Sequence, residues 1–164
     1  MLGIKTQNLA KQLAQRLIDR KRTLSVAESC TGGLLGGALT ALPGTSAIYL
    51  GGACLYSNGA KEFQLGVPKE LMIEHGSVSE ATSLEMARRI RQAFSADIGL
   101  SITGIAGPGG GSENKPVGLV HIAAVSARNQ LHKQLNIAGN RDQVREGGVQ
   151  ASLGLLELLL SLEP

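Results

Sequence analysis

The chain has 164 residues, of which 43% are hydrophobic, 18% are charged and 2% are aromatic, and its formal net charge is +3. This length favours a single domain spanning residues 1–164, and the apolar content at so low a net charge excludes a largely disordered chain. Scarce aromatic side chains and the lack of a long basic block argue against nucleic-acid binding through base stacking or a basic patch.

The spacing of apolar residues predicts helices that alternate with strands. Helical spacing marks 7–22, 34–42, a turn at 60–65, 69–75, 80–94 and the segment from 139–141 to about 162. Short apolar segments predict strands at 23–27, 48–57, 97–103, 117–126 and 131–137. Strands that are apolar on both faces need helices on either side, so the pattern predicts an α/β fold, a three-layer α/β/α single domain. A hairpin turn at 128–130 makes the sheet mixed, although mostly parallel.

Residues 28–33 (ESCTGG) form the first segment that could carry chemistry. They end a predicted strand and open a predicted helix, which is where ligands bind in open α/β sheets. Free N–H groups at a helix N-terminus suit an anion or an oxyanion. Ser29 is preferred over Cys30 as nucleophile, because local spacing places no histidine near the thiol. The alternative is that Ser29 or Thr31 only caps the helix.

Residues 56–61 (YSNGAK) follow the second predicted strand. Lys61 stands near a strand end, beside Tyr56 and Asn58, in a chain with few charges. A lysine that is desolvated in a pocket has a lowered pKa and becomes a usable base, and Tyr56 could orient it or relay a proton. The alternatives are a solvated surface lysine and a tyrosine of the core.

Residues 103–112 (TGIAGPGGGS) form a glycine-rich loop after a predicted strand. The loop lacks the ending of a Walker A motif, and Ser112 replaces the last glycine of a dinucleotide fingerprint that would start at Gly107. It could still wrap a phosphate or nucleoside through backbone contacts, or be a flexible surface loop. Arg141 and Arg145 lie four residues apart on the last helix, which suits a phosphate clamp or a solvated face.

Signals for metal, redox or membrane function are weak. Two cysteines, Cys30 and Cys54, cannot form a four-cysteine zinc site, and the three histidines lack metal-binding spacing. The start of the chain has no apolar signal segment, and the apolar run at 153–162 contains Glu157 and is too short to span a bilayer. We therefore expect a cytoplasmic protein without metal, cofactor or membrane partner, and we expect His121 to be a core histidine.

Five motifs in a fixed order give the chain a clear resemblance. They are AESCTGG (27–33), YSN with AK (56–61), HGSVSE (75–80), TGIAGPGG (103–110) and KPVG (115–118). On these motifs, over essentially its whole length, the chain resembles the C-terminal domain family of the competence-associated protein CinA. That family includes a stand-alone form, nicotinamide-nucleotide amidase.

The resemblance implies an amidase that converts nicotinamide mononucleotide to nicotinic acid mononucleotide and ammonia without a metal. Ser29 corresponds to the family's nucleophile, Lys61 to its general base and Tyr56 to a third member of the catalytic group. Backbone N–H groups near residues 31–33 would stabilise the oxyanion. The residues expected to bind substrate are Thr31, Gly32, Gly33, Asn58, Thr103, Gly104, Gly107, Gly109, Arg141 and Arg145.

Two positions depart from the family pattern. Asn140 stands where an aspartate is usual before Arg141, and Gly59 stands where an acidic residue is common. Loss of the aspartate is expected to weaken the positioning of Arg141, so a non-catalytic nucleotide-binding paralogue is the alternative function. A DNA-associated factor is disfavoured by the low basicity.

The last helix also bears on assembly. Its leucines exceed one buried stripe and therefore favour a homo-oligomer. They are Leu155, Leu156, Leu158, Leu159 and Leu160.

Overall fold

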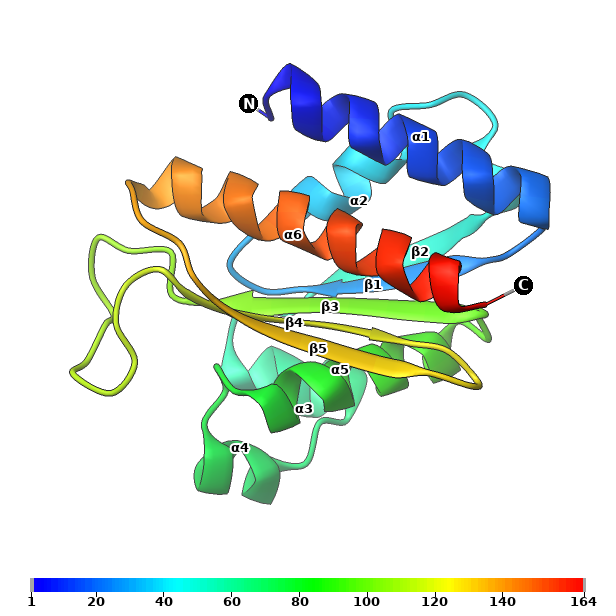
Figure 1. The fold of residues 1–164 in the computed structure, drawn as a ribbon. Helices are drawn as coiled ribbons and strands as arrows, with labels where there is room; N and C mark the ends of the chain where they lie inside the picture. The colour runs from blue at the N-terminus through cyan, green and yellow to red at the C-terminus, as the bar shows by residue number, and fades with distance from the viewer. Residues whose placement is uncertain (1, 164) are drawn as a thin grey trace.

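The structure, a computed structural model, describes residues 2–163 and has three layers (Figure 1). A five-stranded sheet forms the middle layer. One face of the sheet carries α1 (Ile4–Arg20), α2 (Leu34–Leu39) and α6 (Arg141–Leu162). The other face carries α3 (Asn58–Leu65), α4 (Lys69–His75) and α5 (Glu80–Ala93). The predicted α/β/α layering is confirmed.

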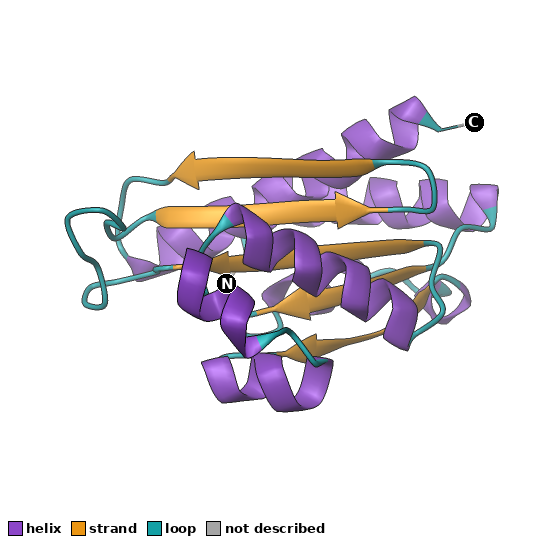
Figure 2. Ribbon diagram, turned by 90° about the horizontal axis from the view of Figure 1, so that it is seen from below, coloured by secondary structure: helices purple, strands orange, loops and turns teal. Residues whose placement is uncertain are grey.

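The strands lie in the order β2-β1-β3-β4-β5, seen side by side in Figure 2. Their bounds are Leu24–Glu28 for β1, Tyr49–Cys54 for β2, Ile98–Gly104 for β3, Leu119–Val125 for β4 and Gln130–Asn136 for β5. β1 pairs in parallel with β2 and β3, whereas the β3–β4 and β4–β5 pairs are antiparallel. Only β4 therefore runs against the other four strands, and the sheet is mixed, as predicted.

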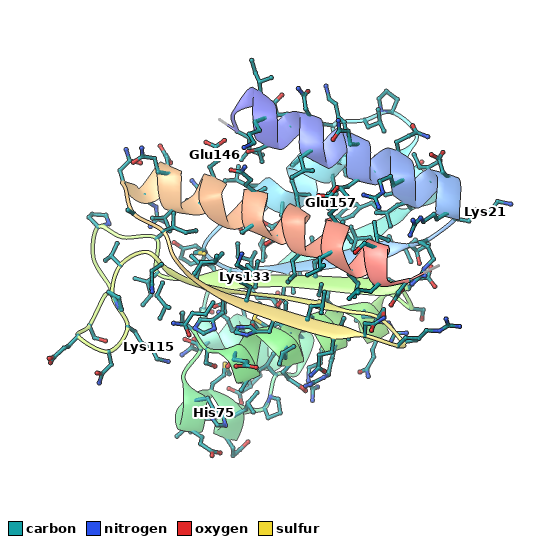
Figure 3. All side chains as sticks on the ribbon, viewed as in Figure 1. Lys21, His75, Lys115, Lys133, Glu146 and Glu157 are labelled. Atoms are coloured by element: carbon teal, nitrogen blue, oxygen red, sulfur yellow. The ribbon has the colours of Figure 1, made fainter. Side chains whose placement is uncertain are left out.

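Burial explains why these segments became strands. β1 and β4 are buried along their whole length and β3 along all but its last residue, because helices cover both faces of the sheet. β5 is an edge strand whose polar side chains are largely exposed, among them Lys133, labelled in Figure 3. A charged side chain on an edge strand discourages pairing with another chain.

The second predicted strand was too long, and the helix after it was too short. β2 ends at Cys54, where the Leu55 N–H makes the last bond to β1 by donating to the Glu28 carbonyl. Ser57 then caps α3 by accepting from the Ala60 N–H at 3.0 Å. The predicted turn at 60–65 is part of the eight-residue α3. A 3₁₀ helix at Thr45–Ala47 was not predicted.

The leucines of α6 are used mostly within the chain. Leu155, Leu156, Leu159 and Leu160 are buried, because α6 packs on the sheet and against α1, while Leu158 is 49% exposed. The surplus leucines therefore no longer argue for a homo-oligomer, which stays a prediction. Neither α6 nor any other helix within residues 2–163 is long and apolar enough to cross a membrane.

The last residue of β1, Glu28, places a buried carboxylate under the start of α2. Its side chain accepts hydrogen bonds from the Thr31 hydroxyl at 2.6 Å and from the N–H groups of Gly33, Leu35 and Gly36 at 3.1, 3.1 and 2.8 Å. The first turn of a helix leaves such N–H groups without partners and carries partial positive charge. Glu28 therefore caps α2 and holds the loop between β1 and α2.

Replacing Glu28 with Ala should lower the free energy of unfolding by on the order of 3 kcal/mol, because four donors lose one acceptor group in a buried position. Glu28→Gln should cost less, since one amide oxygen remains. Urea unfolding measures both. The matched control is Glu157→Gln, which breaks an exposed pair with Arg16 and should change stability by less than about 1 kcal/mol. Equal stability of Glu28→Ala and the control would contradict this account.

Candidate active site

Three loops meet at one edge of the sheet, at the carboxyl ends of β1, β2 and β3. They are residues 29–33, 55–57 and 105–118. Neighbouring parallel strands end at the same edge, so loops that are distant in sequence become neighbours there. In Figure 1 this is the edge from which the long loop between β3 and β4 extends, near the first turn of α6.

Ser29 and Lys61 meet at this edge. The Lys61 Nζ lies 3.1 Å from the Ser29 Oγ, within hydrogen-bond distance, and also donates to the Leu55 carbonyl at 3.0 Å. The Ser29 N–H donates to the Ile102 carbonyl of β3 at 3.0 Å, which anchors the serine to the sheet. Ser29 is 6% exposed and Lys61 only 2% exposed, so the hydroxyl and amine are paired out of bulk water.

Burial changes the acid–base chemistry of Lys61. It lowers the pKa of the amine below the ordinary value of 10.5, and the nearby Cys30 thiol opposes the shift only in part. No carboxylate within residues 2–163 forms an ion pair with this amine. The buried acid Glu28, which ends β1, is engaged by the start of α2. The site therefore favours an uncharged amine that can accept a proton from a hydroxyl.

A pocket of about 220 Å³ opens in front of Ser29. Four predicted substrate-binding residues line it, namely Gly104, Gly107, Gly109 and Arg141, together with Tyr56. The other lining residues belong to segments that the sequence singled out but were not predicted individually to bind substrate; they are Cys30 beside Ser29 and Ile105, Ala106 and Gly110 in the glycine-rich loop. The pocket wall is thus largely backbone and small side chains, which allows a flat ligand to approach closely.

Arg141 and Tyr56 form the polar side of this pocket. Arg141 donates through Nη2 to the Tyr56 hydroxyl at 2.7 Å and through Nη1 to the Gly107 carbonyl at 2.7 Å. Tyr56 is 61% exposed and makes no hydrogen bond to Ser29 or Lys61. Asn140 caps α6 in a reciprocal arrangement with Gln143 and makes no side-chain hydrogen bond to Arg141, so the expected weakening of Arg141 stays a prediction.

Several predicted binding residues point elsewhere. Thr103 is buried and its hydroxyl donates to the Ser77 carbonyl at 2.9 Å, while Asn58 is exposed at the start of α3, outside the pocket lining. Arg145 donates to the Thr31 carbonyl at 3.0 Å and likewise does not line the pocket. These residues do not contact the pocket, and Thr103 and Arg145 instead hold the backbone segments around it.

The backbone donors near Ser29 are fewer than the sequence suggested. The Gly32 N–H donates to the Ser29 carbonyl at 3.0 Å, and the Gly33 N–H donates to Glu28. The N–H groups of Cys30 and Thr31 donate to no oxygen among the described residues. Thr31 is fully buried and does not line the pocket, so the Cys30 N–H, on a residue that does line it, is the donor left for an oxyanion. Glu28 was the missed residue here, and its signal was an acid placed between a strand and a Gly-Gly helix start.

The glycine-rich loop is tied down at two places. Arg141 holds it at Gly107, and the Lys115 amine donates to the carbonyls of His75 and Val78, both at 2.8 Å. Figure 3 labels Lys115 in this loop and His75 on α4 below it. The loop is therefore a fixed wall of the pocket and not only a flexible connection.

His121 packs against another histidine on the α5 face of the sheet. The Nδ1 of His121 lies 3.0 Å from the Nε2 of His132, and the rings stack at 5.2 Å. Burial, with help from His132 and Lys115, lowers the pKa of His121 to about 4. His121 is thus a neutral, buried histidine. Among residues 2–163 no group of three or more His, Cys, Asp or Glu side chains is arranged to hold a metal ion.

The profile of the CinA C-terminal domain matches residues 6–160. The chain belongs to the CinA C-terminal domain family. It is 43% identical over 160 residues to a CinA-like protein of a Synechococcus species, which covers 96% of the chain but only 38% of that relative. A CinA-like protein of Gloeobacter violaceus is 43% identical over 156 residues, again across 37% of its own length. The chain therefore spans less than half of these curated relatives.

Solved structures of CinA proteins match the chain over nearly its whole length. The competence/damage inducible protein CihA of Agrobacterium tumefaciens has a TM-score of 0.93 at 38% identity, covering 100% of this chain and 99% of that one. The competence damage-inducible protein A of Klebsiella pneumoniae has a TM-score of 0.93 at 36% identity, covering 97% and 99%. The fold is thus the CinA fold.

The buried amine should make stability depend on pH. Unfolding returns Lys61 to its ordinary pKa of 10.5, so between the lowered pKa and 10.5 the unfolded chain binds more protons than the folded one. The free energy of unfolding should therefore rise with pH across that window, and Lys61→Met should remove this part of the rise. Urea titrations at about pH 7 and about pH 9 measure it. The exposed Lys11→Met is the control, and an equal pH response in both variants would refute the assignment.

Proposed function

We propose that this chain hydrolyses the carboxamide of nicotinamide mononucleotide, releasing ammonia and nicotinic acid mononucleotide. The observation that carries the proposal is the 3.1 Å contact between the buried Lys61 amine and the Ser29 hydroxyl in front of a pocket. A serine paired with a neutral lysine is an activated nucleophile for acyl transfer. Membership of the CinA family and the motifs that resemble its amidase form support the choice of substrate.

The reaction has two halves. Neutral Lys61 takes the hydroxyl proton as the Ser29 Oγ bonds to the carboxamide carbon, and the N–H group of Cys30 receives the oxyanion. The protonated amine then gives its proton to the departing nitrogen, which leaves as ammonia. A water molecule gives a proton to Lys61 as it attacks the acyl-enzyme, and the protonated amine then gives a proton to the departing Ser29 oxygen, which regenerates the hydroxyl.

Arg141 supplies the positive charge for the substrate's phosphate. It is the cationic side chain in the pocket wall, it lies close to the glycine-rich loop, and the Tyr56 hydroxyl orients it. The helix start at α2 is not a second anion site in this proposal, since Glu28 already occupies it. Tyr56 contributes by holding Arg141.

A non-catalytic nucleotide-binding protein is the second candidate. It would use the same glycine-rich wall and Arg141 but would not need a desolvated lysine beside the serine. Burying a lysine amine that has hydrogen bonds but no ion-pair partner is costly, and this cost favours the enzyme, because a binding module has no use for such an amine.

Purified protein incubated with nicotinamide mononucleotide should release ammonia without added metal. Ser29→Ala and Lys61→Met should each lower the rate by at least about 10³-fold, since nucleophile and base act as one unit. A coupled ammonia assay measures this, with the exposed Lys69→Met as the matched lysine control. Full activity in either site variant would reject the catalytic assignment. Saturable binding of the nucleotide without turnover by the wild type would support the second candidate instead.

The rate should also increase with pH. Only the uncharged amine accepts the Ser29 proton, so kcat/KM should rise as the pH passes upward through the lowered pKa of Lys61. Cys30 is not the titrating group, because burial raises the pKa of its thiol to about 11. The Cys30→Ala variant should keep the same profile shape. A flat profile from about pH 5 to about pH 9 would count against Lys61 as base.

A further inference from the structure

Two arginines reach the site from successive turns of α6, and one contacts the pocket while the other contacts the loop after β1. Arg141 lines the pocket. Arg145 reaches the back of the loop after β1, where its Nη2 donates to the Thr31 carbonyl at 3.0 Å. Its Nη1 lies 3.6 Å from Asp142, and its side chain is only 26% exposed. The Arg145 guanidinium is therefore engaged behind the nucleophile, not in front of it.

Thr31 is the residue that fixes the loop. The Gly32 N–H donates to the Ser29 carbonyl and closes a tight turn over residues 29–32. The Thr31 carbonyl and the Gly32 N–H belong to one planar peptide unit, so holding the carbonyl also sets the direction of the N–H. Gly32 has a φ of +60°, a left-handed conformation in which glycine itself imposes little restraint. A hydrogen bond from another segment to the Thr31 carbonyl therefore restrains the direction of the Gly32 N–H, which glycine alone would leave free.

Arg145 is the strongest donor on that carbonyl. The Leu34 N–H also points to it but at 3.4 Å, which is a long hydrogen bond. A hydrogen bond from a guanidinium is charge-assisted and stronger than one from a neutral amide. On the other side of the turn, the Thr31 hydroxyl is held by Glu28 at 2.6 Å. Thr31 is thus held at two points, because its hydroxyl donates to Glu28 and its carbonyl accepts from Arg145.

We propose that Arg145 is a positioning residue, which acts through the Thr31 carbonyl to keep the Ser29–Gly32 turn in the orientation that the reaction needs. Its catalytic meaning rests on the proposed amidase function. The Gly32 N–H holds the Ser29 carbonyl, which shares a peptide unit with the Cys30 N–H. With the turn held, the Cys30 N–H therefore stays fixed relative to the Ser29 Oγ, as a preorganised oxyanion site requires. Arg141 binds the substrate's anion, whereas Arg145 binds no part of the substrate.

The test compares kinetics of Arg145→Met, Arg145→Lys and Arg141→Met in ammonia release. Arg145→Met should lower kcat by about tenfold to 100-fold while KM stays within about twofold, because a small misplacement of reacting groups is costly. Arg145→Lys should recover part of kcat, since it keeps a charged donor. Arg141→Met should raise KM. The matched control is Arg16→Met, an exposed arginine of α1 paired with Glu157, which should leave both constants unchanged.

A second measurement does not depend on the substrate. Amide hydrogen exchange of Gly32 should accelerate by about tenfold or more in Arg145→Met relative to wild type, because the turn opens more often. Exchange in β3 should not change, which separates local loosening from unfolding. If the wild type releases no ammonia, the amidase proposal fails while the exchange result still decides whether Arg145 holds the turn.

Two outcomes overturn the proposal. A rise of KM with unchanged kcat in Arg145→Met would make Arg145 a substrate ligand. Unchanged Gly32 exchange in a folded Arg145→Met would show that the arginine does not hold the turn, whatever the kinetics. If Arg145→Met exchanges faster throughout β3, it is unfolding globally, and Arg145→Lys replaces it. Its kinetic constants and its Gly32 exchange rate are then measured in the same way, and smaller changes in kcat and exchange are expected.

Discussion

The carboxylate of Glu28 is the contact on which the site depends. It ends β1, accepts four hydrogen bonds from the next eight residues and fixes the start of α2 beneath the sheet edge. Two consequences follow for the chemistry. The positive end of α2 is neutralised by the protein itself, so an anionic ligand must find its charge elsewhere. The carboxylate of Glu28 is also fully engaged by α2, and Lys61 forms no ion pair with any carboxylate within residues 2–163.

An unpaired lysine amine in the interior is costly, and ordinary cores avoid it. Here the amine is paired with a hydroxyl and a carbonyl, which satisfy its donors without favouring its charge. That combination is what a general base for a serine requires. The energetic cost and the proposed chemistry thus have one physical origin, which is the removal of Lys61 from water by α3 packing over the end of β1.

The two arginines of α6 place positive charge at two different positions of the site. Because they are four residues apart, both lie on one face of the helix. Arg141 nevertheless contacts the glycine-rich loop, and Arg145 contacts the Ser29–Gly32 turn. Asn140 caps the helix that carries both, so the departure from the family's usual aspartate is accommodated by another good N-cap residue. The frame of the site is therefore built by α6 as much as by the strand ends.

Apolar periodicity and turn residues in the sequence were enough to predict the layers and nearly all helices and strands of this protein. This is because the apolar pattern of each segment by itself shows whether one face or both faces are buried. The five ordered motifs determined the family. Local pattern misplaced the ends of two elements, the end of β2 and the start of α3, where Ser57 caps the helix. The sequence named Ser29 and Lys61 but could not show that they lie 3.1 Å apart, nor that Thr103 and Arg145 turn away from the pocket. Those facts depend on the parallel pairing of β1 with β2 and β3 and on α6 returning across the sheet, and only the tertiary structure decides such long-range geometry.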